Sequence, residues 1–176
     1  MDTTSEFRER AKDVRVLLCD VDGTLTDGAL YLDDDNVETR RFCVRDGQGI
    51  TAWRRLERPV AIITARPGKA VLERARMLGV DAVLERVEDK HAAVRSVLGR
   101  LGYASEQAAF VGDDLADLRA FRAVGCPIAV ADADPHVRAR AALVTEARGG
   151  HGAVREAIWR ILEVQGLLEH VIEMYS

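Results

Sequence analysis

Three aspartates stand close together after an apolar run near the start of the chain. The segment LLCDVDGTLTDG, residues 17–28, begins with apolar side chains and then presents Asp20, Asp22 and Asp27 within eight positions. Carboxylates this close repel one another, and a hard divalent cation such as Mg²⁺ can neutralise them because it prefers oxygen ligands. The crowding of like charges therefore indicates a metal site.

Other polar residues follow apolar runs farther along the chain. Thr64 ends the run VAIIT, Asp113 and Asp114 follow AAFVG, and Lys90 lies near the start of a predicted helix. In an open parallel sheet, ligands bind beyond the carboxyl ends of the strands. These segments and Asp20 are therefore expected to meet in one polar site at that edge of a sheet.

The hydrophobic pattern predicts the elements that carry these residues. Apolar runs rich in β-branched residues alternate with longer segments of helical periodicity, which indicates a Rossmann-like α/β fold, an open parallel sheet with helices on both faces. The predicted strands are 14–20, 60–64, 81–84, 108–111, 127–130 and a short edge strand at 142–145. The predicted helices are 47–56, 68–78, 88–101, 114–124, 135–140 and an amphipathic C-terminal helix from Gly152, which Gly166 interrupts or caps.

One segment breaks the alternation directly after the aspartates. Residues 29–44, ALYLDDDNVETRRFCV, place two β-like runs around the polar turn DDDN, which predicts a β-hairpin. The acidic residues 33–35 are expected at its solvated tip. The hairpin is therefore predicted to emerge beside the polar site.

Composition limits the class of protein and its surroundings. A chain of 176 residues with 48% hydrophobic content predicts one domain, residues 1–176. A net charge of -4 with scattered basic residues argues against a nucleic-acid or membrane partner and favours a small molecule. The three cysteines lack the spacing of a disulfide framework or zinc site, and the charged N-terminus lacks an apolar signal segment, so a cytoplasmic protein is expected.

The combined motifs resemble those of the haloacid dehalogenase superfamily of phosphatases. The segments that carry the resemblance are DVDGTLTDG at 20–28, the strand end at Thr64, Lys90, and GDDLAD at 112–117. Their order and spacing match over essentially the whole chain. The resemblance implies a phosphatase that uses Mg²⁺ and forms an aspartyl-phosphate.

The resemblance also implies a role for each motif residue. Asp20 is expected to attack phosphorus, and Asp22 to protonate the leaving alcohol and then to activate water. Thr64 and Lys90 are expected to stabilise charge on the phosphoryl group and the nucleophile. The expected metal ligands are Asp20, Asp113 and the backbone carbonyl of Asp22, while Asp114 and Asp117 support the site from behind the ligands.

Three alternatives compete with this interpretation. A receiver domain of a signalling system also brings aspartates, a Thr and a Lys to a sheet edge, but in a different order along the chain, and it has no place for the hairpin. A catalytically silent binding module would not need every chemical residue. A phosphomutase usually needs an enclosing lid, whereas the intervals from Asp22 to Thr64 and from Thr64 to Asp113 are too short for a cap domain.

Among capless members, the chain most resembles 3-deoxy-D-manno-octulosonate 8-phosphate phosphatases. The segments concerned are FCVRDGQGI at 42–50, AIITAR at 61–66, VGDDLADL at 111–118, AVADADP at 129–135 and GGHGAVRE at 149–156. The chain departs from that family at LERVEDK, where a Gln-Gly turn is common, and at GGHG, where GGRG is expected. A nonulosonate 9-phosphate phosphatase, which acts on a nine-carbon sugar acid, therefore remains the alternative.

The implied substrate and assembly lead to two further expectations. A sugar-acid carboxylate needs a fixed cation, so Arg45 and Arg66 are predicted substrate-binding residues, with His151 as an added contact. The resemblance also implies a homotetramer, in which four hairpins could pair and remove exposed strand edges.

Overall fold

The computed structural model describes residues 3–176 and places a parallel sheet at its centre. The six strands lie in the order β5-β4-β1-β6-β7-β8, and every neighbouring pair is parallel. Their bounds are β1 Val16–Cys19, β4 Val60–Ile63, β5 Ala82–Leu84, β6 Ala108–Gly112, β7 Cys126–Ala129 and β8 Leu143–Val144. The strand order reverses beside β1, so the loop after β1 opens where ligands bind in such sheets.

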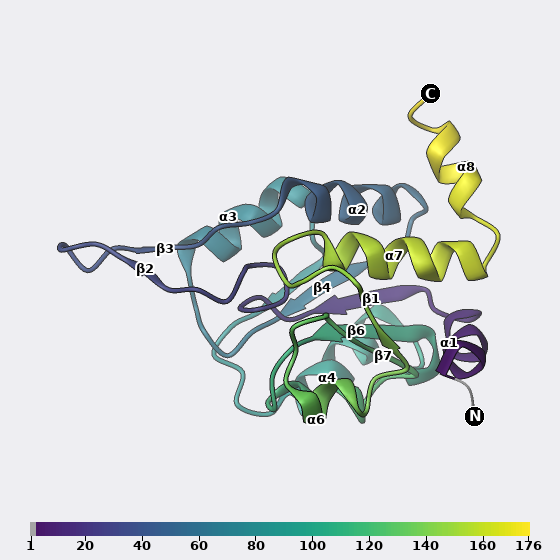
Figure 1. Cartoon of the computed structure of the whole chain (residues 1–176), viewed down its shortest axis with the longest axis horizontal. Coiled ribbons are helices and arrows are strands. Elements are labelled where there is room, and N and C mark those ends of the chain that lie inside the picture. The colour runs from purple at the N-terminus through teal and green to yellow at the C-terminus, as the bar shows by residue number, and fades with distance from the viewer. Residues whose placement is uncertain (1–2) are drawn as a thin grey trace.

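Helices cover both faces of this sheet (Figure 1). Their bounds are α1 Thr3–Ala11, α2 Val44–Arg55, α3 Lys69–Leu78, α4 Lys90–Leu101, α5 Asp117–Phe121, α6 Pro135–Arg138, α7 Ala153–Val164 and α8 Leu168–Glu173. Helices α2, α3 and α7 lie on one face, and α4 and α6 lie on the other. The predicted α/β fold is therefore confirmed, and no cap domain is present within residues 3–176.

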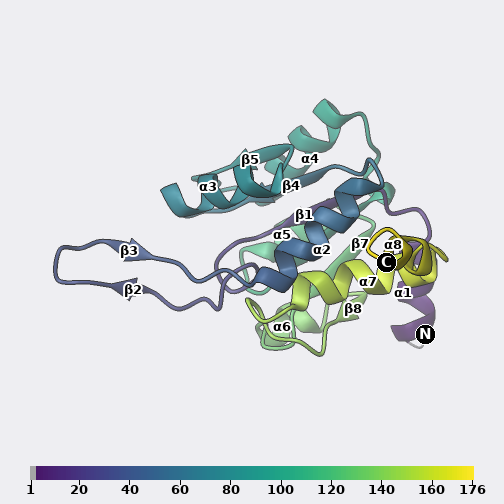
Figure 2. The same cartoon turned by 90° about the horizontal axis from the view of Figure 1, so that it is seen from above.

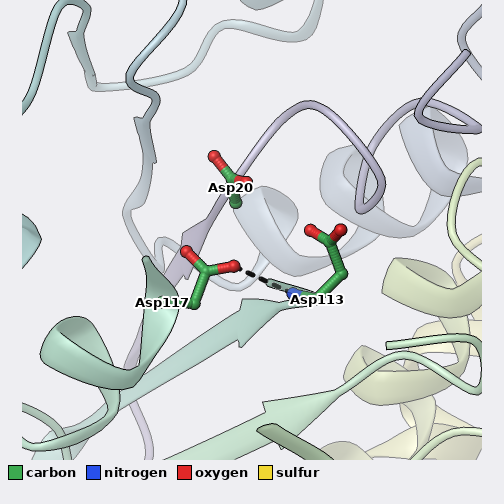
Figure 3. A group of neighbouring side chains, drawn as sticks. All are labelled: Asp20, Asp113 and Asp117. Atoms are coloured by element: carbon green, nitrogen blue, oxygen red, sulfur yellow. Dashed lines mark hydrogen bonds between the residues drawn. The ribbon is translucent and has the colours of Figure 1, made fainter. Parts of the chain in front are cut away.

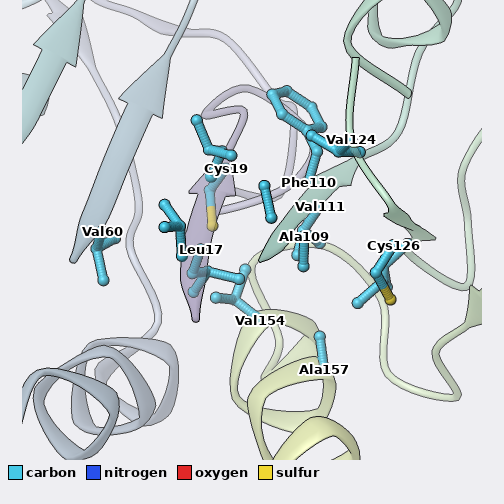
Figure 4. Packing of buried hydrophobic residues seen from close by; sticks show 14 of the residues in the cluster. Leu17, Cys19, Val60, Ala109, Phe110, Val111, Val124, Cys126, Val154 and Ala157 are labelled. Carbon is cyan, nitrogen blue, oxygen red and sulfur yellow. The ribbon is translucent and has the colours of Figure 1, made fainter. Parts of the chain in front are cut away.

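The core lies between the sheet and its helices. Every residue of β1 is buried, and so is every residue of its neighbours β4 and β6. Leu17 of β1 and Val154 and Ala157 of α7 belong to one cluster of buried apolar residues, part of which Figure 4 shows. Continuous apolar strands of this kind are expected where both faces of a sheet are covered. No helix among residues 3–176 is both long and apolar enough to cross a membrane.

The hairpin projects away from the body of the molecule (Figure 2). It consists of β2 Tyr31–Leu32 and β3 Glu38–Thr39, which pair antiparallel. Asp33 shapes the tip because its carboxylate accepts hydrogen bonds from the backbone N–H groups of Asp35 and Val37, at 3.0 and 2.8 Å. The exposed tip confirms the predicted hairpin, although its strands are shorter than expected.

Several predicted boundaries were wrong. Helix α2 begins at Val44, which the sequence pattern places in the hairpin, and α5 begins at Asp117 rather than 114 because the preceding residues form a turn. Helix α1 was not predicted. The break at Gly166 is confirmed, since this residue has a φ of +67° between α7 and α8.

Candidate active site

Asp20 begins the loop that follows β1. Its backbone N–H donates a hydrogen bond of 3.0 Å to the carbonyl of Val111 on the neighbouring strand β6, so the residue stays attached to the sheet edge. The loop then turns at Gly23, where φ is +86° and a Cβ atom would overlap the carboxylate of Asp113. Glycine is needed there for conformation and for space, and the turn brings the loop against β6.

Asp113, directly after β6, and Asp117, the first residue of α5, face Asp20 (Figure 3). Oδ2 of Asp117 accepts hydrogen bonds from the backbone N–H groups of Asp113 and Asp114, at 2.9 and 3.2 Å. The hydroxyl of Thr24 donates a 3.0 Å hydrogen bond to Oδ1 of Asp113. The buried Asp117 thus holds the segment that carries Asp113, while Thr24 orients the Asp113 side chain.

Lys90 supplies the positive charge at the centre of this group. It is the first residue of α4, whose start is capped by the carboxylate of Asp89. The Lys90 Nζ lies 2.8 Å from Oδ1 of Asp20 and 2.6 Å from Oδ1 of Asp117, and the residue is only 3% exposed. Because the ammonium is paired with two carboxylates, it can stay charged although it is buried, and the pKa of Lys90 lies above its ordinary value despite that burial.

The carboxylates carry more negative charge than Lys90 can balance. Burial and the nearby Asp117 carboxylate raise the pKa of Asp20 to about 7, although Lys90 opposes that rise. Burial and the carboxylates of Asp20 and Asp117 raise the pKa of Asp113 to about 8. The environment of both acids thus penalises their ionised form. An added cation would favour that ionised form.

The donor set suits a hard divalent cation. One carboxylate oxygen from each of Asp20, Asp113 and Asp117 lies within 4.8 Å of the others. Both oxygens of Asp117 already accept hydrogen bonds, from Lys90 and from the backbone, so Asp20 and Asp113 carry the less occupied oxygens. Oxygen ligands of this kind fit Mg²⁺. The structure thus groups Asp117 with the predicted ligands Asp20 and Asp113.

Asp22 and Thr64 lie at the border of the carboxylate group. The Asp22 side chain is 24% exposed, and its Oδ1 lies 3.1 Å from Nε of Arg40. The parallel register that pairs Cys19 with Ile62 places Thr64 beside the loop that follows β1. The buried hydroxyl of Thr64 accepts a 3.2 Å hydrogen bond from the backbone N–H of Arg66.

The predicted substrate-binding residues are more dispersed. Arg66 forms an ion pair of 2.8 Å with Glu38 on the hairpin, and its side chain remains 44% exposed. Arg45 and His151 line an open cavity of about 480 Å³ that runs along α7 as far as Leu168. The ring of His151 makes a 2.7 Å hydrogen bond with the Gly149 carbonyl. Asp114 is exposed, and its side chain accepts from the backbone N–H of Leu115.

Two supporting residues were not identified from the sequence. Asp46 on α2 is buried, and its carboxylate accepts backbone hydrogen bonds from Gly152 and Arg155 at 3.2 and 2.9 Å. The loop before α7 contacts the loop that follows Asp20, since the backbone N–H of Gly150 donates a 2.9 Å hydrogen bond to the Thr24 carbonyl. The second is Arg40. The sequence signals for Asp46 were the RDG and GGHG segments, which do not reveal a contact between distant residues, and neither segment contains Arg40.

Comparison with known proteins relates this chain to a family of phosphatases. Residues 83–158 match the model of the haloacid dehalogenase-like hydrolase family. The 3-deoxy-D-manno-octulosonate 8-phosphate phosphatase KdsC of Yersinia pestis is 42% identical over 161 residues, which covers 92% of this chain and 86% of that protein. The corresponding protein of Escherichia coli strain K12 is 41% identical over 160 residues, 91% of this chain and 85% of that protein.

Solved structures agree over nearly the full length. The phosphatase of Moraxella catarrhalis, in complex with a magnesium ion, a phosphate ion and KDO, has a TM-score of 0.94 and 34% identity, with 98% of this chain and 99% of that chain covered. The cobalt-bound enzyme of Haemophilus influenzae has a TM-score of 0.87 and 34% identity, covering 90% and 93% of the two chains. This chain therefore belongs to the 3-deoxy-D-manno-octulosonate 8-phosphate phosphatase family of haloacid dehalogenase-like hydrolases.

Proposed function

We propose that the protein hydrolyses 3-deoxy-D-manno-octulosonate 8-phosphate to the free sugar acid and phosphate. The observation that carries the proposal is the position of Asp20, which directly follows a central strand and faces Lys90, Asp113 and Asp117. The relatives reported above are phosphatases of that sugar-acid phosphate, at 34–42% identity over at least 90% of this chain. The full set of motif residues supports catalysis over a silent binding module.

In this proposal, Asp20 is the nucleophile and Asp22 is the acid and base. Asp20 attacks phosphorus as the bond to the leaving oxygen breaks, and Asp22 gives that oxygen its proton. Asp22 then takes a proton from the water that attacks the aspartyl-phosphate, which releases phosphate and restores Asp20. Thr64 and Lys90 stabilise the negative charge on the phosphoryl oxygens and on Asp20.

The same residues would hold the proposed magnesium ion. Asp20, Asp113 and the backbone carbonyl of Asp22 are the proposed ligands. When bound, Mg²⁺ would neutralise the carboxylates and draw negative charge from the phosphoryl group. Asp117 positions Asp113 by accepting a hydrogen bond from the backbone N–H of Asp113. The side chain of Asp114 stabilises the following turn by accepting one from the backbone N–H of Leu115.

We also propose that the protein assembles as a homotetramer through its hairpins. Four apolar side chains of this segment are exposed in the single chain: Leu30 at 51%, Tyr31 at 45%, Leu32 at 64% and Val37 at 56%. Strands β2 and β3 pair only with each other among residues 3–176. A projecting apolar hairpin with open edges is stabilised when copies pair and cover it.

Phosphate release from matched substrates tests the activity. We expect the eight-carbon 3-deoxy-D-manno-octulosonate 8-phosphate to give a kcat/KM at least about tenfold above that of a nine-carbon nonulosonate 9-phosphate. A neutral hexose 6-phosphate serves as the control without a carboxylate. Faster turnover of the nine-carbon substrate would assign the protein to the alternative that the departures at LERVEDK and GGHG leave open. Equal rates on all three substrates would contradict a sugar-acid phosphatase.

Substitution of the two central aspartates tests the mechanism. Asp20→Asn should abolish turnover, because an amide oxygen is a poor nucleophile toward phosphorus. Asp22→Asn should be severely impaired but could retain the covalent phosphate, which intact-mass measurement after acid quenching would detect. Activity of Asp20→Asn within about tenfold of the wild type would rule out the aspartyl-phosphate route.

A further inference from the structure

A buried arginine at the base of the hairpin reaches three different segments of the chain. The side chain of Arg40 is only 3% exposed. Its Nε lies 3.1 Å from Oδ1 of Asp22, and its Nη2 lies 2.9 Å from Oε1 of Glu38. The same Nη2 donates a 3.4 Å hydrogen bond to the carbonyl of Pro67, in the loop that follows Thr64. Arg40 thus joins the loop after β1, the hairpin and the loop after β4.

The way Arg40 is buried is poorly suited to stabilising the fold. Its Nη1 is buried with no hydrogen-bond partner among residues 3–176, and its Nε is close to Asp22 but is not aligned for a hydrogen bond. Desolvation of a guanidinium is costly, and a buried ion pair often stabilises a protein no more than apolar side chains of the same volume would. The arrangement therefore calls for a reason other than stability.

The contact of Arg40 with Asp22 provides a reason other than stability for burying this arginine. We propose that Arg40 is a positioning residue whose charge attracts Oδ1 of Asp22 through the ion pair and leaves the other Asp22 carboxylate oxygen for proton transfer to the leaving group. This inference rests on the proposed role of Asp22 as the acid. Proton transfer requires the donor oxygen to stay within hydrogen-bond reach of the leaving oxygen, and a partly exposed Asp22 side chain with no partner could rotate away.

The hairpin sets the position of Arg40 in turn. The Glu38 carboxylate on β3 contacts Arg40 through Oε1 and Arg66 through Oε2, at 2.9 and 2.8 Å. An unbroken series of ion pairs therefore runs from Asp22 through Arg40 and Glu38 to Arg66. Because both arginines share one carboxylate, the orientation of Asp22 depends on where the base of the hairpin lies.

A comparison of leaving groups separates positioning from a general structural effect. An alkyl phosphate has a poor leaving group that needs a proton from Asp22, whereas p-nitrophenolate leaves without one. In single-turnover measurements, Arg40→Ala should slow cleavage of the sugar-acid phosphate by about tenfold or more, within the range that general acids contribute. Cleavage of p-nitrophenyl phosphate should change by less than about threefold in the same experiment.

Four further variants complete the test. Arg40→Lys keeps a charge but loses the planar fork, so it should restore part of the alkyl-phosphate rate, whereas Arg40→Gln should not. Asp22→Asn should show the same selective loss as Arg40→Ala. Arg54→Ala is the matched control, because Arg54 also pairs with an aspartate, Asp81 at 3.1 Å, on an element remote from the proposed chemistry; its rates should stay within about twofold of the wild type on both substrates.

The outcomes distinguish this inference from the proposed function. Equal losses on the two substrates, or no loss in a folded Arg40→Ala protein, would overturn the positioning role. If the wild type cleaves another alkyl phosphate instead of the sugar-acid phosphate, the proposed function fails, and the same comparison with that alkyl phosphate still tests Arg40. Circular dichroism and thermal melting identify folded variants, and if Arg40→Ala does not fold, Arg40→Gln takes its place.

Discussion

The ammonium group of Lys90 lies 2.6 Å from Oδ1 of the fully buried Asp117, and the same nitrogen lies 2.8 Å from Asp20. One cation therefore serves both the proposed nucleophile and the carboxylate that holds Asp113. Removal of Lys90 would leave two buried carboxylates facing each other without a counter-charge. The site and the stability of this part of the fold depend on the same ion pairs.

Lys90→Met should accordingly lose both activity and stability. We expect turnover to fall by at least about a hundredfold and the free energy of unfolding to fall by about 3 kcal/mol, since breaking a buried pair leaves an uncompensated charge. Denaturant unfolding and phosphate release measure the two effects. The double variant Lys90→Met with Asp117→Asn should recover part of the stability without activity. Near-normal turnover of Lys90→Met would contradict the charge-balancing role.

Activity should require a divalent cation. Protein dialysed against a chelator should be inactive and should regain turnover on addition of Mg²⁺, because Asp20, Asp22 and Asp113 otherwise repel the phosphate dianion. Asp113→Ala should raise the Mg²⁺ concentration needed for half-maximal rate by about tenfold or more. Glu73→Ala is the control, since that carboxylate pairs with Arg76 on the exposed side of α3. Full activity after exhaustive chelation would refute the metal site.

The stability of metal-free protein should fall as pH rises. The folded-state pKa values of about 8 for Asp113 and about 7 for Asp20 lie above the ordinary value of 3.8. The folded state thus binds protons that the unfolded chain has lost, and this stabilisation is fully present below about pH 4 and is lost as pH rises through 7 to 8.

Thermal melting measures this dependence. The chelated protein should melt at a higher temperature at about pH 6 than at about pH 8.5, and Asp113→Asn should reduce the difference. Excess Mg²⁺ should raise the melting temperature most at the higher pH, because the ion binds the deprotonated carboxylates. A metal-free melting temperature that rises over this range would contradict the assigned environment of these two groups.

Arg45 and Arg66 should affect the sugar acid more than a simple ester. If they bind the substrate carboxylate, Arg45→Ala and Arg66→Ala should each lower kcat/KM for the sugar-acid phosphate by roughly tenfold, about 1.4 kcal/mol of transition-state binding. Turnover of p-nitrophenyl phosphate, which has no carboxylate, should change much less. Equal losses on both substrates would show that these arginines serve the phosphate or the fold. Arg66 already pairs with Glu38, so Glu38→Gln tests whether that pair limits binding.

The hairpin should determine the oligomeric state. We expect sedimentation at micromolar concentration to show a tetramer for the wild type and smaller species for Leu32→Asp, because a charge replaces the most exposed apolar side chain of the hairpin. Ile172→Asp on α8 alters a comparably exposed apolar residue outside the hairpin and should leave the tetramer intact. A wild-type protein that sediments only as a monomer would exclude the assembly.

The sequence by itself determined the sheet and the carboxylate group. Uninterrupted apolar runs such as VAII at 60–63, alternating with helical segments, are typical of a doubly covered parallel sheet, and the carboxyl ends of parallel strands lie at one edge. Asp20 and Asp113 follow such runs directly, so their meeting needed no knowledge of packing. The start of α2 did not follow from the pattern, because the β-branched Val44 suits a strand, yet it is the first residue of the helix and its side chain is largely exposed.

Only the tertiary structure decided that Asp46 and Arg40 support the site. Asp46 holds Gly152 from 106 residues away, and Arg40 reaches Asp22 from a hairpin that has no fixed place until it packs. The sequence pointed to Arg45 and Arg66 as the cations near the mouth, whereas the structure puts Arg40 on Asp22. Periodicity reports which face of an element is buried, but it contains no information on which distant partner a buried charge will meet, because that depends on how the loops approach one another in three dimensions.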